Sequence, residues 1–411
     1  MTQRPEKILL LDTGNEWGGG TNSMLELLKR IDRTQFDVRC CFYHNYRRGA
    51  GDSIKQVLQA LGIPFILIPQ RKQPRWAKMA KEVLRTLVFY SRTQRQKMTN
   101  HIDMRWRIRP NARRIRQLIA DYQADILYMN NQPGSNAEGY LAAEGLPIAV
   151  VQHCRIEPVL NPQLVRLVNR RADAVIAVSN GVRKVLLDNG VAPEKCFTVF
   201  NAIDIHQRLP DRLTMRRELL DIEDDTFVFG SIGSLIARKS HHHVLSALEK
   251  FAAAFPQARW RMVILGEGPD LAALQAQAKK AGIADRVTFA GFRSNPLDYL
   301  AAFDVFVLAS KSEGLPRVVL EAMLLNTAVI GSRVTGTAEL VTHAQTGLLF
   351  EYGDIDGLFA QMKTLYLDAD TRKNLLAQAN ASVKQHYAIE HYVSGVESRL
   401  KSAAHGNSSH V

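Results

Sequence analysis

Short runs of apolar residues recur along the first half of the chain, and a stretch with helical periodicity follows each of them. The runs are continuous rather than alternating, which is typical of strands that helices cover on both faces, and hence of a parallel sheet. The predicted strands of this half are Ile8–Leu11, Val38–Tyr43, Phe65–Ile68, Ile126–Met129, Ile148–Val151, Ala174–Val178 and Thr198–Phe200. We therefore expect a doubly wound α/β domain here.

The same alternation restarts after a polar, charged stretch from Asp204 to Asp225. A second parallel-sheet domain is predicted from the runs Phe227–Ile232, Met262–Leu265, Val287–Ala290, Val305–Leu308, Ala328–Ile330 and Leu348–Phe350. Two such domains in tandem bring the carboxyl ends of two sets of strands toward one crevice, and ligands bind at that end of open α/β sheets. The pattern thus predicts a ligand cleft between two domains, with the boundary near residues 205–225.

The composition is that of a soluble globular protein, with 46% hydrophobic and 23% charged residues. No apolar run reaches the roughly 20 residues that a bilayer span needs, and residues 1–7 lack the apolar stretch of a signal peptide. A cytoplasmic location is therefore expected. The cysteines form neither a CxxC pair nor a dense disulfide framework, so reduced thiols are expected at Cys40, Cys41, Cys154 and Cys196.

The net charge of +13 indicates an anionic partner, such as a nucleotide, a nucleic acid or an acidic membrane surface. A basic segment, residues 71–116, contains fifteen Lys or Arg against two acidic residues, and so carries the whole excess. Within it, apolar residues from Trp76 to Tyr90 line one face of a predicted helix. That helix is expected either to lie on an anionic membrane or to pack on the first domain. The segment lacks the aromatic spacing of a stacking platform, so a nucleic acid is not expected.

Glycine-rich turns follow several of the predicted strands. The first strand leads through residues 17–22, Trp-Gly-Gly-Gly-Thr-Asn, into a helix, where Gly19 allows a ligand to approach and helix amides favour an anion. A tight strand-to-helix turn also uses glycine, so this signal alone is weak. In the second domain, Gly233 is followed by Arg238 and Lys239 at a helix start, where the helix dipole disfavours cations. Because the helix does not stabilise these two cations, we expect them to be there for an anionic ligand, namely a diphosphate.

The most specific feature is Ser-Glu-Gly-Leu-Pro at residues 312–316, followed by a helical run. Pro316 suits the first turn of a helix, which places Glu313 on the loop before it and Glu321 more than one turn inside. Two carboxylates at different depths can bind hydroxyls at two places along one long ligand. Gly314 permits a close backbone approach, and the helix N-terminus can hold a phosphate between the carboxylates. Another glycine turn, at residues 334–339, is expected to face the same cleft.

Together these residues resemble glycosyltransferase family 4, retaining enzymes of the GT-B fold, over nearly the whole chain. The most specific match is the pair Glu313 and Glu321, with seven residues between them. Supporting matches are Leu-Gly-Glu-Gly-Pro at 265–269, Phe-Ala-Gly at 289–291, Ala-Val-Ser at 177–179, Asn-Ala-Ile-Asp at 201–204 and Thr-Gly-Leu-Leu-Phe at 346–350. The expected fold class is α/β of the GT-B type, two Rossmann-like doubly wound parallel-sheet domains facing a cleft.

The resemblance implies a division of the chain. Residues 1–204 would form an acceptor domain that includes the basic segment, and residues 205–385 a domain that binds a nucleotide-sugar donor. A C-terminal helix at 386–401 would return to the first domain, and residues 402–411 would form a flexible tail.

The resemblance also implies roles for individual residues. Glu313 would contact hydroxyls of the donor sugar, Glu321 the nucleotide ribose, and Lys239, with Arg238, the diphosphate. Further donor contacts are expected at Gly19, Gly233, Gly314 and Leu315. The residues expected to be catalytic are Glu313, Lys239 and His153.

His153 matches the family histidine near the transferred sugar, although a lone His after a strand is more often structural. Two departures from the family pattern bear on the donor. The family usually has Arg where this chain has Ser234, and Gly where it has Ala202 and Ser240. Loss of that Arg would remove a bidentate phosphate contact unless Arg238 replaces it, which puts donor affinity in doubt.

The implied function is retaining transfer of a hexose-type sugar from a UDP- or GDP-sugar to a glycan or lipid-linked acceptor, in cell-envelope polysaccharide or lipopolysaccharide synthesis. The basic segment would bring the enzyme to the inner face of the cytoplasmic membrane. No cofactor or metal is expected, because no carboxylate cluster has Mg²⁺-like spacing. The alternatives are a nucleotide-sugar epimerase or phosphorylase on the same architecture, and a non-catalytic nucleic-acid-binding or scaffold protein.

Overall fold

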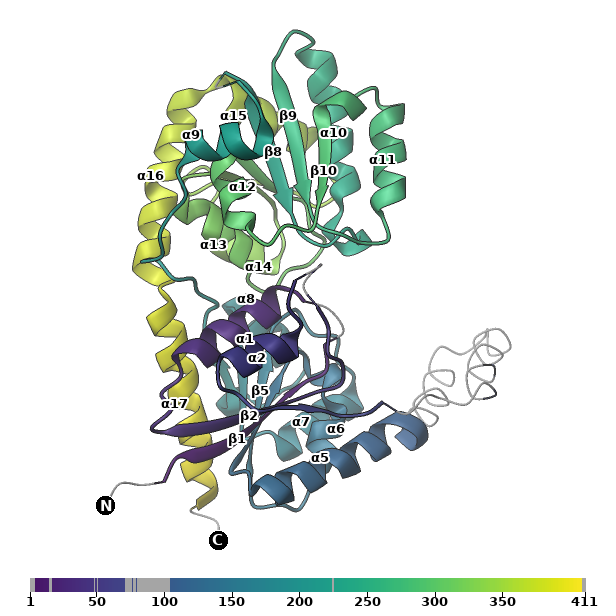
Figure 1. Cartoon of the computed structure of the whole chain (residues 1–411), viewed down its shortest axis with the longest axis vertical. Helices are drawn as coiled ribbons and strands as arrows, with labels where there is room; N and C mark the ends of the chain where they lie inside the picture. Colours follow the sequence, from purple (N-terminus) through teal and green to yellow (C-terminus); the bar gives the residue numbers. More distant parts are fainter. Residues whose placement is uncertain are drawn as a thin grey trace.

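The computed structural model describes residues 4–14, 17–47, 49, 51–70, 76, 79, 104–223 and 225–408. These residues contain two parallel sheets, each between layers of helices, in two domains that follow one another along the long axis (Figure 1). The predicted fold class is therefore confirmed. Both sheets reverse their strand order once, and each reversal lies next to the strand that opens its domain.

The first sheet has the order β3-β2-β1-β4-β5-β6-β7, and every neighbouring pair is parallel. Its strands are β1 Glu6–Asp12, β2 Phe36–Phe42, β3 Phe65–Leu67, β4 Ile126–Asn130, β5 Ala149–Cys154, β6 Ala174–Ala177 and β7 Cys196–Thr198. The last strand lies two residues earlier than predicted, because Cys196 rather than Thr198 begins the pairing with β6. The switch in order between β1 and β4 places a ligand crevice at their carboxyl ends.

The helices of the first domain divide between the two faces of this sheet. Apolar residues of α1 (Gly19–Arg30), α2 (Ile54–Ala60) and α17 (Ile389–Ser408) share one core with the sheet. The opposite core contains apolar residues of α5 Arg109–Tyr122, α6 Ala137–Ala142, α7 Pro162–Arg171 and α8 Asn180–Asp188. Strands covered in this way must be apolar on both faces, which is why the continuous apolar runs predicted them correctly.

The second sheet has the order β10-β9-β8-β11-β12-β13, again all parallel. Its strands are β8 Phe227–Ile232, β9 Trp260–Leu265, β10 Val287–Gly291, β11 Val305–Leu308, β12 Ala328–Ser332 and β13 Leu348–Phe350. The helices are α9 Arg212–Met215, α10 His241–Ala254, α11 Leu271–Lys280, α12 Pro296–Ala302, α13 Arg317–Leu324, α14 Thr335–Leu340, α15 Ile355–Leu367 and α16 Ala369–His386. The order switches between β8 and β11, so the loops after these strands form the second half of a crevice.

After α16 the chain returns to the first domain as α17, which packs against β4, β5, β6 and α1 (Figure 1). Tyr392 and Leu400 of this helix are buried in the core of the first domain. Residues 402–408 do not form the flexible tail that was expected at 402–411, because α17 continues to Ser408. Ala403 is buried against the same core, which stabilises this last part of the helix. Residues 409–411 lie outside the described residues.

Most of the basic segment, namely residues 71–75, 77–78 and 80–103, lies outside the described residues. Trp76 and Met79 are 60% and 67% exposed, and the Trp76 ring meets the Trp106 ring edge-on at 5.8 Å between centroids. The end of the segment forms the first half of α5, where Ile115 is buried in the core. None of the helices within the described ranges combines the length and apolarity of a membrane span.

Candidate active site

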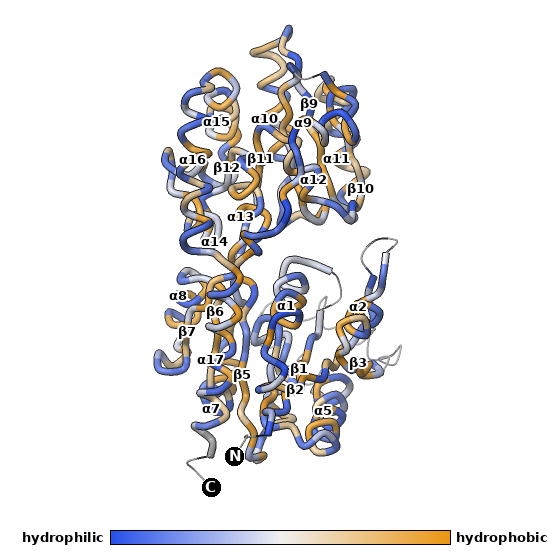
Figure 2. The backbone as a smooth tube through the Cα atoms, turned by 60° about the vertical axis from the view of Figure 1, so that its left-hand side comes forward, coloured by the Kyte–Doolittle hydropathy of each residue, from blue (hydrophilic) through white to orange (hydrophobic). Residues whose placement is uncertain are grey.

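The two domains meet at the carboxyl ends of their strands, where α14 lies next to α8 (Figure 2). Glu339 of α14 accepts hydrogen bonds from the backbone N–H groups of Asn180 (2.8 Å) and Gly181 (3.0 Å) at the start of α8. A carboxylate from one domain therefore caps a helix of the other domain, where the helix dipole favours negative charge. This contact fixes one edge of the crevice.

The loop at residues 312–316 also touches the first domain. The Asn201 side-chain amide donates to the Leu315 carbonyl at 3.0 Å. A Cβ on Gly314 would lie 2.4 Å from the Arg155 carbonyl oxygen, so only glycine fits between this loop and the end of β5. The predicted donor residues Gly314 and Leu315 therefore lie at the contact between the two domains.

Glu313 forms a buried ion pair with the cations of the loop after β8. The Glu313 residue is 8% exposed, and its Oε1 lies 2.6 Å from Lys239 Nζ and 3.5 Å from Arg238 Nη1. Burial by itself raises the pKa of Glu313, but the charges of Lys239 and Arg238 and the hydrogen bond from Lys239 outweigh it, so the pKa is lowered. The carboxylate is thus held ionised.

Local backbone geometry places these cations. A short 3₁₀ turn at Ala237–Lys239 is followed by Ser240, whose φ of 51° is left-handed and precedes α10. The Ser240 hydroxyl donates to the Ala237 carbonyl at 3.1 Å and so closes the turn. Gly233, at the end of β8, lies beside Lys239, and a Cβ there would touch Lys239 Cε at 3.4 Å. The sequence predicted Gly233, Arg238 and Lys239 as one group, and the structure brings them together.

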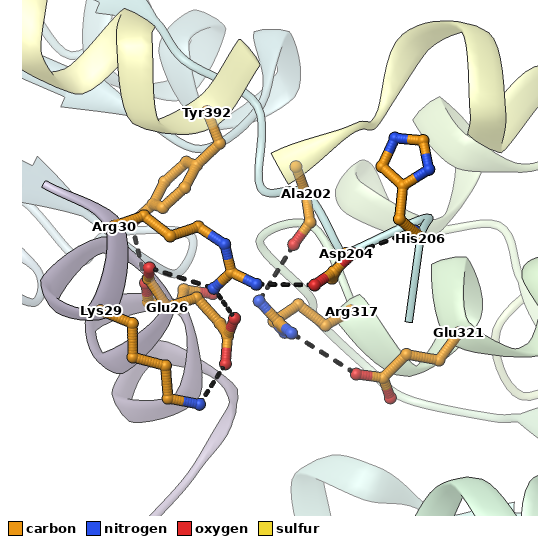
Figure 3. A network of polar contacts seen from close by, with 10 residues as sticks. Glu26, Lys29, Arg30, Ala202, Asp204, His206, Arg317, Glu321 and Tyr392 are labelled. Carbon is orange, nitrogen blue, oxygen red and sulfur yellow. Dashed lines mark hydrogen bonds and ion pairs between the residues drawn. The ribbon is translucent and has the colours of Figure 1, made fainter. Parts of the chain in front are cut away.

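Glu321 lies just over one turn inside α13, as predicted, although Pro316 is the N-cap residue before the helix and not part of its first turn. Its Oε1 is 3.7 Å from Arg317 Nη2, and Arg317 Nη1 donates to the Ala202 carbonyl at 3.0 Å (Figure 3). Ala202 belongs to the connecting segment, residues 199–226, which follows β7 at the edge of the first domain and leads to β8. Glu321 therefore lies next to a cation that is fixed to the backbone of that segment.

The glycine-rich start of α1, residues 18–20, lies at the carboxyl end of β1 on the first domain's side. Among the described residues, no atom lies within 4 Å of a Cβ built on Gly18 or Gly19, whereas one on Gly20 would touch the Arg155 side chain at 3.5 Å. No described side chain caps the N-terminus of α1. Backbone amides with this orientation favour an anion, so Gly19 lies where a phosphate could approach.

His153 lies at the carboxyl end of β5, but its imidazole is 0% exposed. Its Nδ1 is 2.6 Å from the Tyr128 hydroxyl, which also accepts from Arg155 at 3.4 Å. Either group can be the donor in the contact between Nδ1 and the Tyr128 hydroxyl, and Nε2 is buried without a hydrogen-bond partner among the described residues. Burial, followed by the charge of Arg155, keeps the pKa of His153 well below its ordinary value. The imidazole is neutral, and contact with a sugar would require this end of β5 to rearrange.

Sequence reasoning missed Arg155 and Glu157, which follow β5. Arg155 is 4% exposed and donates to Asn130 Oδ1 at 2.7 Å, beneath the glycine-rich turn. Glu157 Oε2 accepts from Ser312 Oγ at 3.3 Å and Thr335 Oγ1 at 3.4 Å, both in the second domain. The signal that could have found them is two charged residues directly after an apolar strand, at the edge where parallel strands present their ligand-binding loops.

Three consecutive histidines, His241, His242 and His243, open α10. His241 is buried, and its burial lowers the pKa to about 4. Within the described part of the chain, no three His, Cys, Asp or Glu side chains lie in an arrangement that could hold a metal ion.

Two doubly wound parallel sheets whose carboxyl edges face each other define the GT-B class of glycosyltransferase folds. Solved structures of that class are similar over nearly the whole chain. The crystal structure of HepE from Anabaena in complex with UDP and glucose has a TM-score of 0.76 and 22% identity, and covers 97% of this chain and 100% of that one. The galactosyltransferase WaaB, of the lipopolysaccharide outer core, has a TM-score of 0.67 and 16% identity, and covers 97% and 99%.

The family follows from the sequence comparison. Residues 17–207 match the model of Glycosyltransferase Family 4, and residues 214–381 match that of glycosyl transferases group 1. This chain belongs to glycosyltransferase family 4.

Curated relatives resemble part of the chain. N-acetyl-alpha-D-glucosaminyl L-malate synthase of Bacillus anthracis is 30% identical over 245 residues, which are 59% of this chain and 62% of that protein. The lipopolysaccharide core biosynthesis glycosyltransferase LpsE of Rhizobium meliloti is 28% identical over 174 residues, 42% and 49% of the two chains. The match thus spans 62% and 49% of the length of these two relatives, less than two thirds in both cases.

Proposed function

We propose that this chain transfers a sugar from a nucleotide-sugar donor to an acceptor bound at the first domain. The observation that carries the proposal is the buried pair of Lys239 and Glu313, 2.6 Å apart, at the carboxyl edge of the second sheet. A buried cation and an ionised carboxylate side by side suit a diphosphate and a hydroxylated sugar that are joined to each other. The loop that holds Glu313 also contacts the first domain through Gly314.

In the proposed complex, Glu321 accepts hydrogen bonds from the ribose, and Lys239 and Arg238 bind the diphosphate. Backbone amides of Gly314, Leu315 and Gly233 contribute from the second domain. Gly19 approaches the diphosphate from the first domain. Since HepE was crystallised with UDP and with UDP-glucose, uridine nucleotides are the first donors to test.

The proposed reaction retains the configuration at the anomeric carbon. The bond from that carbon to the diphosphate oxygen breaks, the acceptor oxygen bonds to the same face, and the acceptor proton passes to the leaving phosphate. Negative charge grows on the leaving oxygen, so Lys239 and Arg238 stabilise the transition state more than the bound donor. We propose that these fixed cations act without a metal. His153, which is fully buried at the end of β5, does not contact the donor in this arrangement.

We further propose a lipid-linked or lipopolysaccharide-type acceptor at an anionic membrane surface, bound through the basic segment. Trp76 and Met79 are exposed apolar side chains at one end of the segment, and Arg105 and Arg109 are exposed cations at the other. Each cation near such a surface adds about 1 kcal/mol of attraction. The name of the Rhizobium relative, a lipopolysaccharide core enzyme, supports this acceptor class.

Liposome flotation tests the membrane proposal. We expect the wild type to float with vesicles of phosphatidylglycerol and phosphatidylcholine at low salt, and Arg105→Gln with Arg109→Gln to reduce binding. Arg107 is left unchanged because it lies 3.6 Å from the buried carboxylate of Glu138. Arg333→Gln, at an exposed ion pair with Glu351, is the matched control. Equal flotation of all variants, or none at low salt, would contradict the proposal.

Calorimetry tests the donor site. We expect UDP or GDP to bind the wild type, and Glu321→Ala to bind at least about tenfold more weakly because a charge-assisted hydrogen bond is lost. Glu351→Ala, which removes a glutamate that is 70% exposed in the same domain, should bind normally. Absence of binding by every nucleoside diphosphate would refute the transferase function. Turnover of the donor without acceptor, to an epimer, would instead indicate an epimerase.

A further inference from the structure

Arg317 is the first residue of α13, and its own helix does not stabilise a positive charge at that position. The positive end of the helix dipole disfavours a cation in the first turn. An Arg four residues before a Glu is also the less favourable order for a helical ion pair. The Arg317 side chain is nevertheless only 12% exposed, so its charge is largely removed from water. Its stabilising partners therefore include groups outside its own helix.

Those partners come from three parts of the molecule (Figure 3). Arg317 Nη1 donates to the Ala202 carbonyl at 3.0 Å, in the segment between the domains, and Nη2 lies 3.7 Å from Glu321 Oε1. The positive charge also acts on Glu26 of α1. Burial raises the pKa of Glu26, but Lys29, Arg317 and Arg30 together lower it below its ordinary value.

The same network continues to the connecting segment by a second route. Glu26 pairs with Lys29 at 2.8 Å and with Arg30, and Arg30 reaches Asp204 at 2.7 Å. Its three cations and three carboxylates balance, namely Lys29, Arg30 and Arg317 with Glu26, Asp204 and Glu321 (Figure 3). Arg317 is the member of this network that contacts both the connecting segment and Glu321.

We propose that Arg317 is a positioning residue for the nucleotide: anchored to the Ala202 carbonyl, it holds the Glu321 carboxylate in the orientation that the ribose hydroxyls require. The proposal rests on the proposed role of Glu321 as the ribose-binding group. A distance of 3.7 Å is an ion pair rather than a hydrogen bond, so Arg317 orients the carboxylate without using its lone pairs.

The chemistry of arginine suits this task. Its planar fork can donate to a carbonyl with one nitrogen and face a carboxylate with the other, which a lysine cannot do in the same geometry. A glutamate side chain that is free to rotate loses rotamer freedom when it binds a ligand. Because Arg317 fixes Glu321 before the ligand binds, this rotamer entropy is not lost on binding. The gain in affinity is confined to ligands that carry the ribose hydroxyls, since only these contact Glu321.

A pair of nucleotides isolates this effect. Binding of UDP and of 2′,3′-dideoxy-UDP is measured by calorimetry for the wild type, Arg317→Leu and Arg317→Lys, with the guanosine pair run in parallel. We expect the wild type to prefer UDP by about tenfold or more, since the hydroxyl contacts are charge-assisted. In Arg317→Leu the preference should fall below about threefold, with little change for dideoxy-UDP. Arg317→Lys should restore part of the preference.

The control is Lys29→Leu, which removes a cation of the same network that pairs with Glu26. It should leave the preference for UDP intact. An unchanged preference for UDP in Arg317→Leu would overturn the proposal. If the affinities for both nucleotides also fall equally, Arg317 has a merely structural role. If Arg317→Leu does not fold, Arg317→Lys and Arg317→Gln carry the same comparison.

Glu321→Ala separates this proposal from the one on which it rests. If the preference for UDP is lost in Glu321→Ala but kept in the Arg317 variants, the ribose site stands and only the positioning role fails. If the wild type binds both nucleotides equally, the role of Glu321 fails, and the role of Arg317 fails with it.

Discussion

Replacement of Lys239 by methionine should slow sugar transfer far more than it weakens the fold. Methionine keeps most of the aliphatic length and removes the charge. The Lys239 side chain is 14% exposed, and its Nζ lies 2.6 Å from the ionised Glu313. A diphosphate bound beside this pair would therefore meet a cation with little water between them.

The size of the effect follows from Coulomb's law. Two unit charges about 4 Å apart interact by about 4 kcal/mol at an effective dielectric constant of about 20. Only part of this differs between ground and transition state, because the leaving oxygen already carries some charge. Loss of a single oxyanion donor elsewhere costs about 2.7–4 kcal/mol, so we expect kcat to fall about 10²- to 10³-fold.

The fold should lose less, because Glu313 keeps a partner. Removing one member of a buried ion pair costs about 3–5 kcal/mol when the remaining charge has no other partner. Arg238 stays 3.5 Å from Glu313, although its side chain is 41% exposed. We therefore expect the free energy of unfolding to fall by less than that range, about 2 kcal/mol.

The assay follows UDP release from UDP-glucose at saturating donor, which detects donor hydrolysis before the acceptor is known. Thermal unfolding confirms that the variant is folded at the assay temperature. Lys250→Met is the matched control, since Lys250 forms an exposed ion pair with Asp356 in the same domain. A fall in kcat of less than about tenfold, with the variant folded and UDP bound, would refute the assignment of Lys239 to the leaving diphosphate.

Three further changes test the geometry of the site. Gly314→Ala forces a Cβ to 2.4 Å from the Arg155 carbonyl oxygen. We expect the free energy of unfolding to fall by about 1–3 kcal/mol and the radius of gyration, measured by X-ray scattering, to increase. An unchanged melting temperature would contradict the contact. Glu313→Gln tests the lowered pKa of Glu313. The ionised group stabilises the fold above the unfolded pKa of about 4.3, and this stability is lost as the pH falls through the folded pKa. In denaturant titrations the variant should therefore be less stable than the wild type at pH 7, and the difference should shrink below about pH 4. Glu339→Gln keeps the shape but removes the charge that caps α8, so stability should drop by about 0.5–2 kcal/mol with UDP affinity unchanged in calorimetry; a lost UDP affinity would show that this contact also shapes the donor site.

Much of the proposed donor site could be predicted because its chemistry is local in the sequence. Arg238 and Lys239 are adjacent, and Glu313 and Glu321 lie on one loop and the helix after it. The turn chemistry of glycine and proline places such residues at strand ends without knowledge of the partner domain. What the sequence did not reveal is that Lys239 and Glu313 pair with each other, because they are separated by most of a domain.

The amino-acid pattern is enough to predict the two parallel sheets and their approximate strand limits, since strands buried on both faces must be continuously apolar. It also determined which strand ends carry candidate chemistry. The tertiary structure decided how far those residues are exposed. His153, a catalytic candidate by resemblance, is fully buried against Tyr128, a contact between neighbouring strands that no local pattern encodes.

The tertiary structure also decided how the domains are joined. Nothing in the local sequence around Arg317 points to a partner, and the Ala202 carbonyl to which it donates lies more than a hundred residues away along the chain. Hydrophobic periodicity shows which face of an element is buried, but it does not show which charged side chains pair across a domain boundary. Such pairs depend on the packing of two finished domains, and only the folded chain specifies them.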